Sequence, residues 1–306
     1  MAAQYLVLDI GGTFIKYALM DAEANSLEEG KVPSDTSGEQ AVLSSLALVA
    51  ERFADRDYAG VAISMPGRID MEKGIAHTGG AFEWLKDYPA AERYGAVFGK
   101  PCTIANDGKC AAYAESWRGA LADVDSGAVL VLGTGIGGGI VLNREVWMGC
   151  SGGAGELSVM PVDYDAYREG ADPGRARRGM WTERISAKTL VDTYRERTGR
   201  EDVDGIQLFD DYEASDPLAK EVIDEFAFQA AVGIYGLQSV LDLPRYAIGG
   251  GISARPETTQ VVRDTVEKLF SSHPATPFSM PEIVTCHFGN EANLIGALAF
   301  HLKAQG

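Results

Sequence analysis

Short apolar runs that end at glycine recur at three places along the chain. The runs LVLDI (6–10), AVLVL (128–132) and YAIG (246–249) each lead into a glycine turn, at 11–13, 133–139 and 249–251. Such short apolar runs, bounded by glycine, are typical of buried strands. A second strand-like run follows each of the first two turns. The pattern therefore predicts two strand–turn–strand units, at 4–21 and 127–143, and a weak internal duplication.

Between these strands the apolar positions change to helical spacing. In 37–54 they recur on one face, and Ser37 with Gln40 has the spacing of a capping box. The segment YAGVAIS predicts a strand that runs into a loop at Pro66 and Gly67. Further helices are predicted at about 186–199, 217–243 and 291–303, the second ended by Pro244. Alternating strands and helices indicate an α/β fold.

Two positions suggest chemistry and also have a purely structural interpretation. Gly11 and Gly12 suit either a hairpin turn or a cradle of backbone N–H groups for an anion. Asn106 and Asp107 end the strand PCTIAND just before a predicted helix. A carboxylate there is a common helix cap, but the carboxyl end of a strand in an α/β sheet is also where ligands bind.

Length and charge restrict the class of protein. A chain of 306 residues suggests two domains or one large one, and the boundary is expected near 117, giving domains 1–117 and 118–290, the first completed by the helix 291–306. A net charge of −17 disfavours nucleic acids and anionic membranes as partners. The N-terminus lacks the pattern of a signal peptide, no apolar run reaches membrane-spanning length, and the four cysteines show no CxxC spacing. We therefore expect a cytoplasmic protein.

Taken together, the motifs DIGGT, AND, GTGIGGGI, GGAGE and IGGGIS resemble, in order and separation, those of the ROK family of sugar kinases and repressors. The resemblance covers most of the chain. It implies a two-domain actin-like ATPase (ribonuclease H-like) fold, with each domain a mixed β-sheet flanked by helices. It also implies a Mg-ATP-dependent sugar kinase whose domains close on the sugar.

The resemblance further implies a role for each motif. Asp107 is the general base that activates the sugar hydroxyl, and Asp9 holds Mg²⁺ through water. The expected sugar ligands are Asn106, Glu156, Gly67 and Glu183. The expected nucleotide-binding residues are Asp9, Gly11, Gly12, Thr13, Lys16, Gly133, Thr134, Gly135, Gly249, Gly250 and Gly251. For Lys16 a phosphate contact and a plain exposed charge are equally compatible with the sequence.

One departure from the commoner family pattern concerns zinc. Where many relatives have the histidine and cysteines of a structural zinc site, this chain has Val159, Pro173, Arg175 and Met180. None of these is a normal zinc ligand, so no zinc is expected. A glutamate that contacts sugar in the zinc-bearing relatives falls on Thr182, with Glu183 one position away. The chain thus resembles the zinc-free branch that includes β-glucoside kinases, in which an opened pocket accepts a glucoside and the 6-hydroxyl is phosphorylated.

Other functions stay open as alternatives. Kinases for a free hexose, of glucokinase, fructokinase or N-acetylmannosamine kinase type, share the same motifs. Repressors of the family have a DNA-binding domain before DIGGT, whereas eight residues precede Asp9 here. A sugar-binding regulator without that domain is a weaker alternative. The resemblance leaves both a homodimer and a homotetramer open, and ATP is expected as donor rather than polyphosphate.

Overall fold

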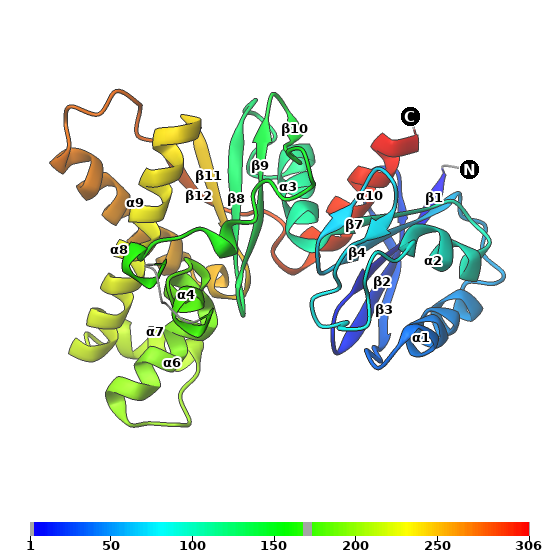
Figure 1. Ribbon diagram of the computed structural model, residues 1–306, viewed down its shortest axis with the longest axis horizontal. Coiled ribbons are helices and arrows are strands. Elements are labelled where there is room, and N and C mark those ends of the chain that lie inside the picture. The colour runs from blue at the N-terminus through cyan, green and yellow to red at the C-terminus, as the bar shows by residue number, and fades with distance from the viewer. Residues whose placement is uncertain (1–2, 168–172, 306) are drawn as a thin grey trace. The chain divides into compact units, whose positions relative to one another are not determined.

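The computed structural model describes residues 3–167 and 173–305, and it divides into two compact units (Figure 1). Unit 1 comprises 1–118, Val146–Ala154 and 290–306, and unit 2 comprises 119–145 and 155–289. The chain leaves unit 1 after Arg118 and returns for Val146–Ala154, a segment that the sequence analysis assigned to the second domain. No helix in the described ranges is both long and apolar enough to cross a bilayer.

The sheet of unit 1 has the order β3-β2-β1-β4-β7. Its strands are β1 (Gln4–Ile10), β2 (Phe14–Asp21), β3 (Ser26–Pro33), β4 (Gly60–Met65) and β7 (Cys102–Asn106). The first three pair antiparallel, whereas β4 lies parallel to β1 and β7 parallel to β4. Because β1, β4 and β7 run parallel, their carboxyl ends, at Ile10, Met65 and Asn106, meet at one edge of the sheet.

Four helices pack around this sheet. They are α1 (Glu39–Arg52), α2 (Ala90–Phe98), α3 (Asp107–Arg118) and α10 (Ala292–Gln305), and a small hairpin of β5 (Ile69–Asp70) and β6 (Ile75–Ala76) precedes α2. Helix α10 packs against α3 and against the three parallel strands. The predicted capping box of α1 is wrong: the N-cap is Gly38, and the Ser37 N–H donates instead to Asp35 Oδ1 at 2.9 Å.

The sheet of unit 2 repeats the topology, with the order β10-β9-β8-β11-β12. Its strands are β8 (Gly127–Leu132), β9 (Ile136–Leu142), β10 (Glu145–Val146), β11 (Arg245–Gly249) and β12 (Glu282–Thr285). Here β8 pairs antiparallel with β9 and parallel with β11, as β1 does with β2 and β4. This shared order supports the internal duplication that the two glycine hairpins predicted.

Helices make up most of the rest of unit 2. They are α4 (Pro173–Arg178), α5 (Thr182–Ile185), α6 (Ala187–Thr198), α7 (Gly205–Glu213), α8 (Pro217–Leu241) and α9 (Pro256–Ser272), with short 3₁₀ turns at Leu157–Val159, Tyr164–Tyr167 and Gly251–Ala254. A further 3₁₀ turn, Gly289–Glu291, lies where the chain passes from unit 2 to unit 1. The apolar face of α8 lies in the main core of this unit together with Trp181 and Tyr246. The prediction of mixed sheets flanked by helices is confirmed. The elements that were not predicted are β3, β5, β6, β10, β12, α2, α4, α5, α7 and α9.

Candidate active site

Asp9 lies near the carboxyl end of β1, and three side chains surround its carboxylate. Ser64, its register partner on β4, donates to Asp9 Oδ1 at 3.0 Å. Asn293, at the start of α10, donates to the same oxygen at 3.2 Å. Lys16, opposite Asp9 in the β1–β2 pair, places Nζ 3.9 Å from Oδ2. The carboxylate is thus fixed through Oδ1, with a cation on the side of Oδ2.

Burial raises the pKa of Asp9 above its ordinary value, and the hydrogen bonds from Ser64 and Asn293 and the charge of Lys16 oppose this rise. A nearby divalent cation would favour the charged form, and Mg²⁺ prefers one or two carboxylates plus water and phosphate oxygens. Among the described residues, no three His, Cys, Asp or Glu side chains cluster so that they could hold a metal. A single fixed carboxylate therefore fits Mg²⁺ that arrives with a nucleotide, not a cage made only of protein ligands.

The turn between β1 and β2 has little room for a side chain at Gly11. Gly11 N–H donates to Phe14 O at 3.0 Å, and a Cβ on Gly11 would lie only 3.1 Å from that oxygen. Neither Gly11 nor Gly12 has a positive φ, so left-handed backbone geometry does not explain them. Gly12 and Thr13 are exposed. The turn therefore leaves main chain accessible to a ligand at the end of β1, next to Asp9.

Asn106 and Asp107 lie where β7 ends and α3 begins, as predicted. Asp107 Oδ1 accepts hydrogen bonds from Gly108 N at 2.8 Å and from Asn106 Nδ2 at 3.0 Å. Asn106 Nδ2 also donates to Gly67 O at 2.9 Å, and Asn106 Oδ1 caps the helix by accepting from Lys109 N at 3.0 Å. Both side chains are half-buried. Asn106 therefore caps α3 through Oδ1 and orients the Asp107 carboxylate through Nδ2.

Gly67 has a structural reason to be glycine. Its φ is +106°, and a Cβ there would lie 2.0 Å from Thr78 O. Its carbonyl oxygen accepts the hydrogen bond from Asn106 Nδ2, so Gly67 lies beside the residue that orients Asp107.

The glycines at the ends of β8 and β11 divide into two groups. Gly249 and Gly250 are required by packing, because a Cβ would lie 2.8 Å from Cys286 Sγ and 2.3 Å from Leu132 O, respectively. At Gly135 a Cβ would lie 3.1 Å from Thr182 Oγ1, so that side chain would have to move by a few tenths of an ångström. Within the described part of the chain, no atom lies within 4 Å of such a Cβ on Gly251, and a Cβ on Gly133 meets only Gly135 O at 3.9 Å. Neither has a positive φ. The protein itself does not require glycine at 133 or 251.

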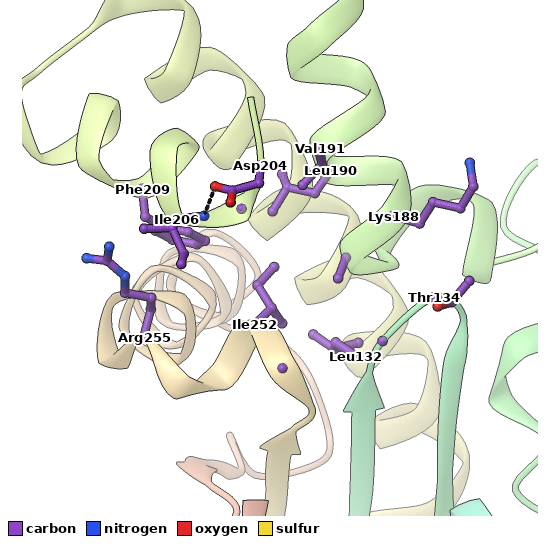
Figure 2. A pocket seen from close by; sticks show the side chains of 14 residues that line it. Leu132, Thr134, Lys188, Leu190, Val191, Asp204, Ile206, Phe209, Ile252 and Arg255 are labelled. Carbon is purple, nitrogen blue, oxygen red and sulfur yellow. Dashed lines mark hydrogen bonds between the residues drawn. The ribbon is translucent and has the colours of Figure 1, made fainter. Parts of the chain in front are cut away.

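Both of these glycines line a pocket of about 680 Å³ within unit 2 (Figure 2). Leu132, Gly133 and Thr134 come from the end of β8, and Gly251 and Ile252 follow β11. The opposite wall comes from α6 and the start of α7, with Leu190, Val191, Ile206 and Phe209. The size and the mainly apolar lining are typical of a small-molecule site.

The charged side chains at this pocket already have partners. Asp204 Oδ1 accepts from Ile206 N and Gln207 N, both at 2.9 Å, as the N-cap of α7. Lys188 pairs with Asp192, and Arg255 pairs with Asp210 and Glu213. The rest of the pocket lining is mainly apolar side chains, together with the glycines that follow β8 and β11.

The two predicted sugar-contacting glutamates differ in their surroundings. Glu156 is exposed and precedes the 3₁₀ turn Leu157–Val159. Glu183 accepts a hydrogen bond from Arg177 Nε at 2.9 Å. Thr182 uses its hydroxyl to accept from Ile136 N at 3.1 Å, which supports the loop after β8. Val159 is exposed, Met180 is half-buried, and the side chains of Pro173 and Arg175 lie outside the described residues.

Sequence reasoning missed four groups that contribute to these arrangements. Asn293 is 284 residues from Asp9, so no local pattern could join them. Ser64 lay within a predicted strand, but the pattern of one strand does not reveal the register that pairs it with Asp9. The pocket wall combines α6, which was predicted as a helix at about 186–199 without a role in a site, with α7, which was not predicted. Lys109 is fully buried two residues after Asp107, where a lysine between apolar residues was the available signal.

Comparison with known proteins places the chain in one family. The model described as "ROK family" matches residues 5–304. A β-glucoside kinase of Listeria monocytogenes is 31% identical, with 97% of this chain and 97% of the relative aligned. A β-glucoside kinase of Klebsiella pneumoniae is also 31% identical, with coverages of 95% and 93%. A crystal structure of a ROK family protein from Streptococcus pneumoniae TIGR4 in complex with sucrose is 26% identical, with a TM-score of 0.87 and 99% of both chains aligned.

The family match, the relatives and the structural neighbour all extend over nearly the whole chain, and the two sheets have the order and flanking helices expected of an actin-like ATPase. This protein belongs to the ROK family.

Proposed function

We propose that this protein transfers the γ-phosphoryl group of ATP to the 6-hydroxyl of a glucose unit, preferentially in a β-glucoside. The coarser statement, that it is a ROK sugar kinase, rests on the family match and on the kinase relatives. The proposed nucleotide site rests on one observation: Gly133 and Gly251 both line the apolar pocket of unit 2, although packing does not require glycine at either position.

In this proposal Asp107 accepts the proton of the attacking hydroxyl. Phosphoryl transfer needs little covalent help from the protein, so a carboxylate within hydrogen-bond reach of the hydroxyl is sufficient as base. Asn106 fixes the carboxylate through Oδ1 and the sugar contacts follow the family pattern, with Asn106 and Glu156 as ligands. Glu183 also belongs to the proposed set, and one of its carboxylate oxygens accepts a hydrogen bond from Arg177 Nε at 2.9 Å.

The nucleotide is held by both glycine turns and by the pocket. The main chain at Gly11, Gly12 and Thr13, and at Gly133, Thr134 and Gly135, provides donors for phosphates, and the pocket beside Gly249–Gly251 takes adenosine. Asp9 would hold Mg²⁺ through water, and the metal would neutralise charge on the phosphates. Lys16 belongs to the nucleotide group because its ammonium lies on the Oδ2 side of Asp9.

Replacing Gly251 with leucine tests the nucleotide pocket. The added side chain meets no protein atom near its Cβ, so the fold should persist while the KM for ATP rises by about tenfold or more, because the chain occupies space meant for the ligand. Steady-state kinetics with ATP varied would measure this, and the KM for sugar should stay unchanged. Gly236→Leu is the matched control, since a Cβ at Gly236 on α8 also meets nothing within 4 Å. An unaltered KM for ATP in Gly251→Leu would contradict the assignment.

The β-glucoside preference has two supports. Val159 and Thr182 replace a histidine and a glutamate that close the sugar pocket in zinc-bearing relatives, and Thr182 is committed to Ile136 N. The two β-glucoside kinases align over nearly their full length, and the structural neighbour from S. pneumoniae was crystallised with a disaccharide, sucrose. A sugar acceptor with a substituent at the anomeric position fits these features.

The proposed use of ATP also fits a cytoplasmic location.

An ADP-release assay with Mg-ATP against cellobiose, gentiobiose, glucose, mannose, fructose, N-acetylglucosamine and N-acetylmannosamine tests the function. We expect kcat/KM to be higher for the two glucosides than for any free hexose. Turnover restricted to one free hexose would retain the kinase and reject the glucoside preference. Sugar binding without any turnover would reject the kinase in favour of a sugar-binding regulator.

A further inference from the structure

Lys109 is a fully buried lysine in the first turn of α3, two residues after Asp107. Lysine is almost never fully buried unless its ammonium is paired. Its backbone N–H donates to Asn106 Oδ1 at 3.0 Å, so its main chain is joined to the residue that orients Asp107. The proposed chemistry assigns no task to its side chain.

The side chain reaches a different segment. Lys109 Nζ donates a hydrogen bond to the carbonyl oxygen of Ala154, and Ala154 N donates to Met148 O at 3.2 Å. Ala154 ends Val146–Ala154, the segment that belongs to unit 1 although both of its neighbours along the chain belong to unit 2. Glu156 follows two residues later. Lys109 therefore joins helix α3 to the segment that leads directly into a proposed sugar ligand.

The composition of that segment explains why it needs an outside anchor. The sequence GCSGGAG (149–155) has four glycines in seven residues, and glycine loses more conformational freedom on ordering than any other residue. An apolar side chain at 109 would fill the buried space without the cost of desolvating an ammonium. A charged donor inside a low-dielectric region, in contrast, fixes the direction of one carbonyl group.

We infer that Lys109 is a positioning residue for the sugar, which holds the 146–154 segment so that the acceptor binds, and that it has no part in binding ATP. This inference rests on the proposed sugar kinase function. Lys109 lies outside the motifs, and none of the predicted roles includes it.

Lys109→Met tests it, because methionine retains much of the apolar volume and removes the ammonium. We expect the KM for the best acceptor to rise about tenfold or more, since small misplacements of a binding group are costly, while the KM for ATP changes by less than about twofold. Calorimetric titration of the sugar without ATP should show the same loss of affinity. Lys303→Met is the matched control. Lys303 is on α10, and its Nζ lies 5.9 Å from the ring centroid of Tyr113 on α3. Its substitution should leave both KM values unchanged.

A second variant covers the case in which Lys109→Met does not fold. Gly152 has φ +76°, and a Cβ there would lie 3.0 Å from Ile69 O, so Gly152→Ala is expected to displace the same segment at a different contact. It should raise the KM for sugar and spare that for ATP. A folded variant of either kind with unchanged sugar affinity, or with the KM values for sugar and ATP raised equally, would overturn the inference. Failure of the sugar kinase function itself is distinguished by the wild-type protein, which would then turn over no acceptor.

Discussion

Asp107→Asn is expected to lower kcat by about 10²- to 10⁴-fold, the usual contribution of a general base. The amide has nearly the shape of the carboxylate and keeps an acceptor oxygen, so the hydrogen bonds from Gly108 N and Asn106 Nδ2 can persist. Sugar and ATP affinity should therefore change little, while the proton of the attacking hydroxyl loses its acceptor. Steady-state kinetics together with sugar titration separate these effects.

Asp216→Asn provides a control for this substitution. Asp216 also lies at a helix start, where its Oδ1 accepts from Ala219 N at 2.9 Å, and asparagine caps a helix about as well as aspartate does. Its kinetics should match the wild type. If Asp107→Asn kept more than about a tenth of wild-type kcat, a base contribution of the expected size would be absent and the role would be refuted.

Asp9→Asn is expected to make a more stable but nearly inactive protein. Loss of the carboxylate that would hold Mg²⁺ should lower kcat/KM by about 10²- to 10³-fold, as loss of one electrostatic stabiliser does elsewhere. Asparagine still offers an oxygen to Ser64 and Asn293, and Lys16 is half-exposed, so little structure is lost. Calorimetric measurement of Mg-ATP affinity gives a readout independent of turnover.

The stability gain follows from the raised pKa of Asp9. Because the folded pKa lies above the unfolded value of 3.8, the folded state binds more protons between the two values, so this residue's contribution to stability falls as pH rises through that window. At neutral pH the folded state carries the full desolvation penalty of the buried Asp9 charge, and asparagine removes this penalty. In the absence of metal and nucleotide, the Tm of Asp9→Asn should exceed that of the wild type at neutral pH, and the difference should shrink as the pH approaches 3.8.

Asp21→Asn, on strand β2 of the same sheet, is expected to change the Tm in the opposite direction. The hydrogen bond from Asn25 holds the pKa of Asp21 below its ordinary value, so its charged form stabilises the fold at neutral pH. Its substitution should lower the Tm slightly and leave the kinetics unaltered. A lower Tm for Asp9→Asn as well would mean that burial does not dominate the energetics of Asp9.

The sequence by itself determined the class of fold and the candidate residues of the site. Apolar runs bounded by glycine predicted β1, β2, β4, β7, β8, β9 and β11, because buried strands need continuous apolar side chains and their turns need residues without them. The order of the five motifs indicated the family. Asp9, Asp107 and the glycine turns could be proposed as site residues because each lies within a few residues of a strand end, which a local sequence pattern reveals.

Only the tertiary structure decided which distant groups complete these local features. Ser64 and Asn293 reach Asp9 through strand register and through a helix 284 residues away. Lys109 can donate to the Ala154 carbonyl oxygen because the segment Val146–Ala154 returns to unit 1. Packing also separated Gly249 and Gly250, which the fold requires, from Gly251, which it does not. These assignments depend on three-dimensional proximity and on the space around a missing Cβ, and neither quantity is encoded in the spacing of residues along one strand or helix.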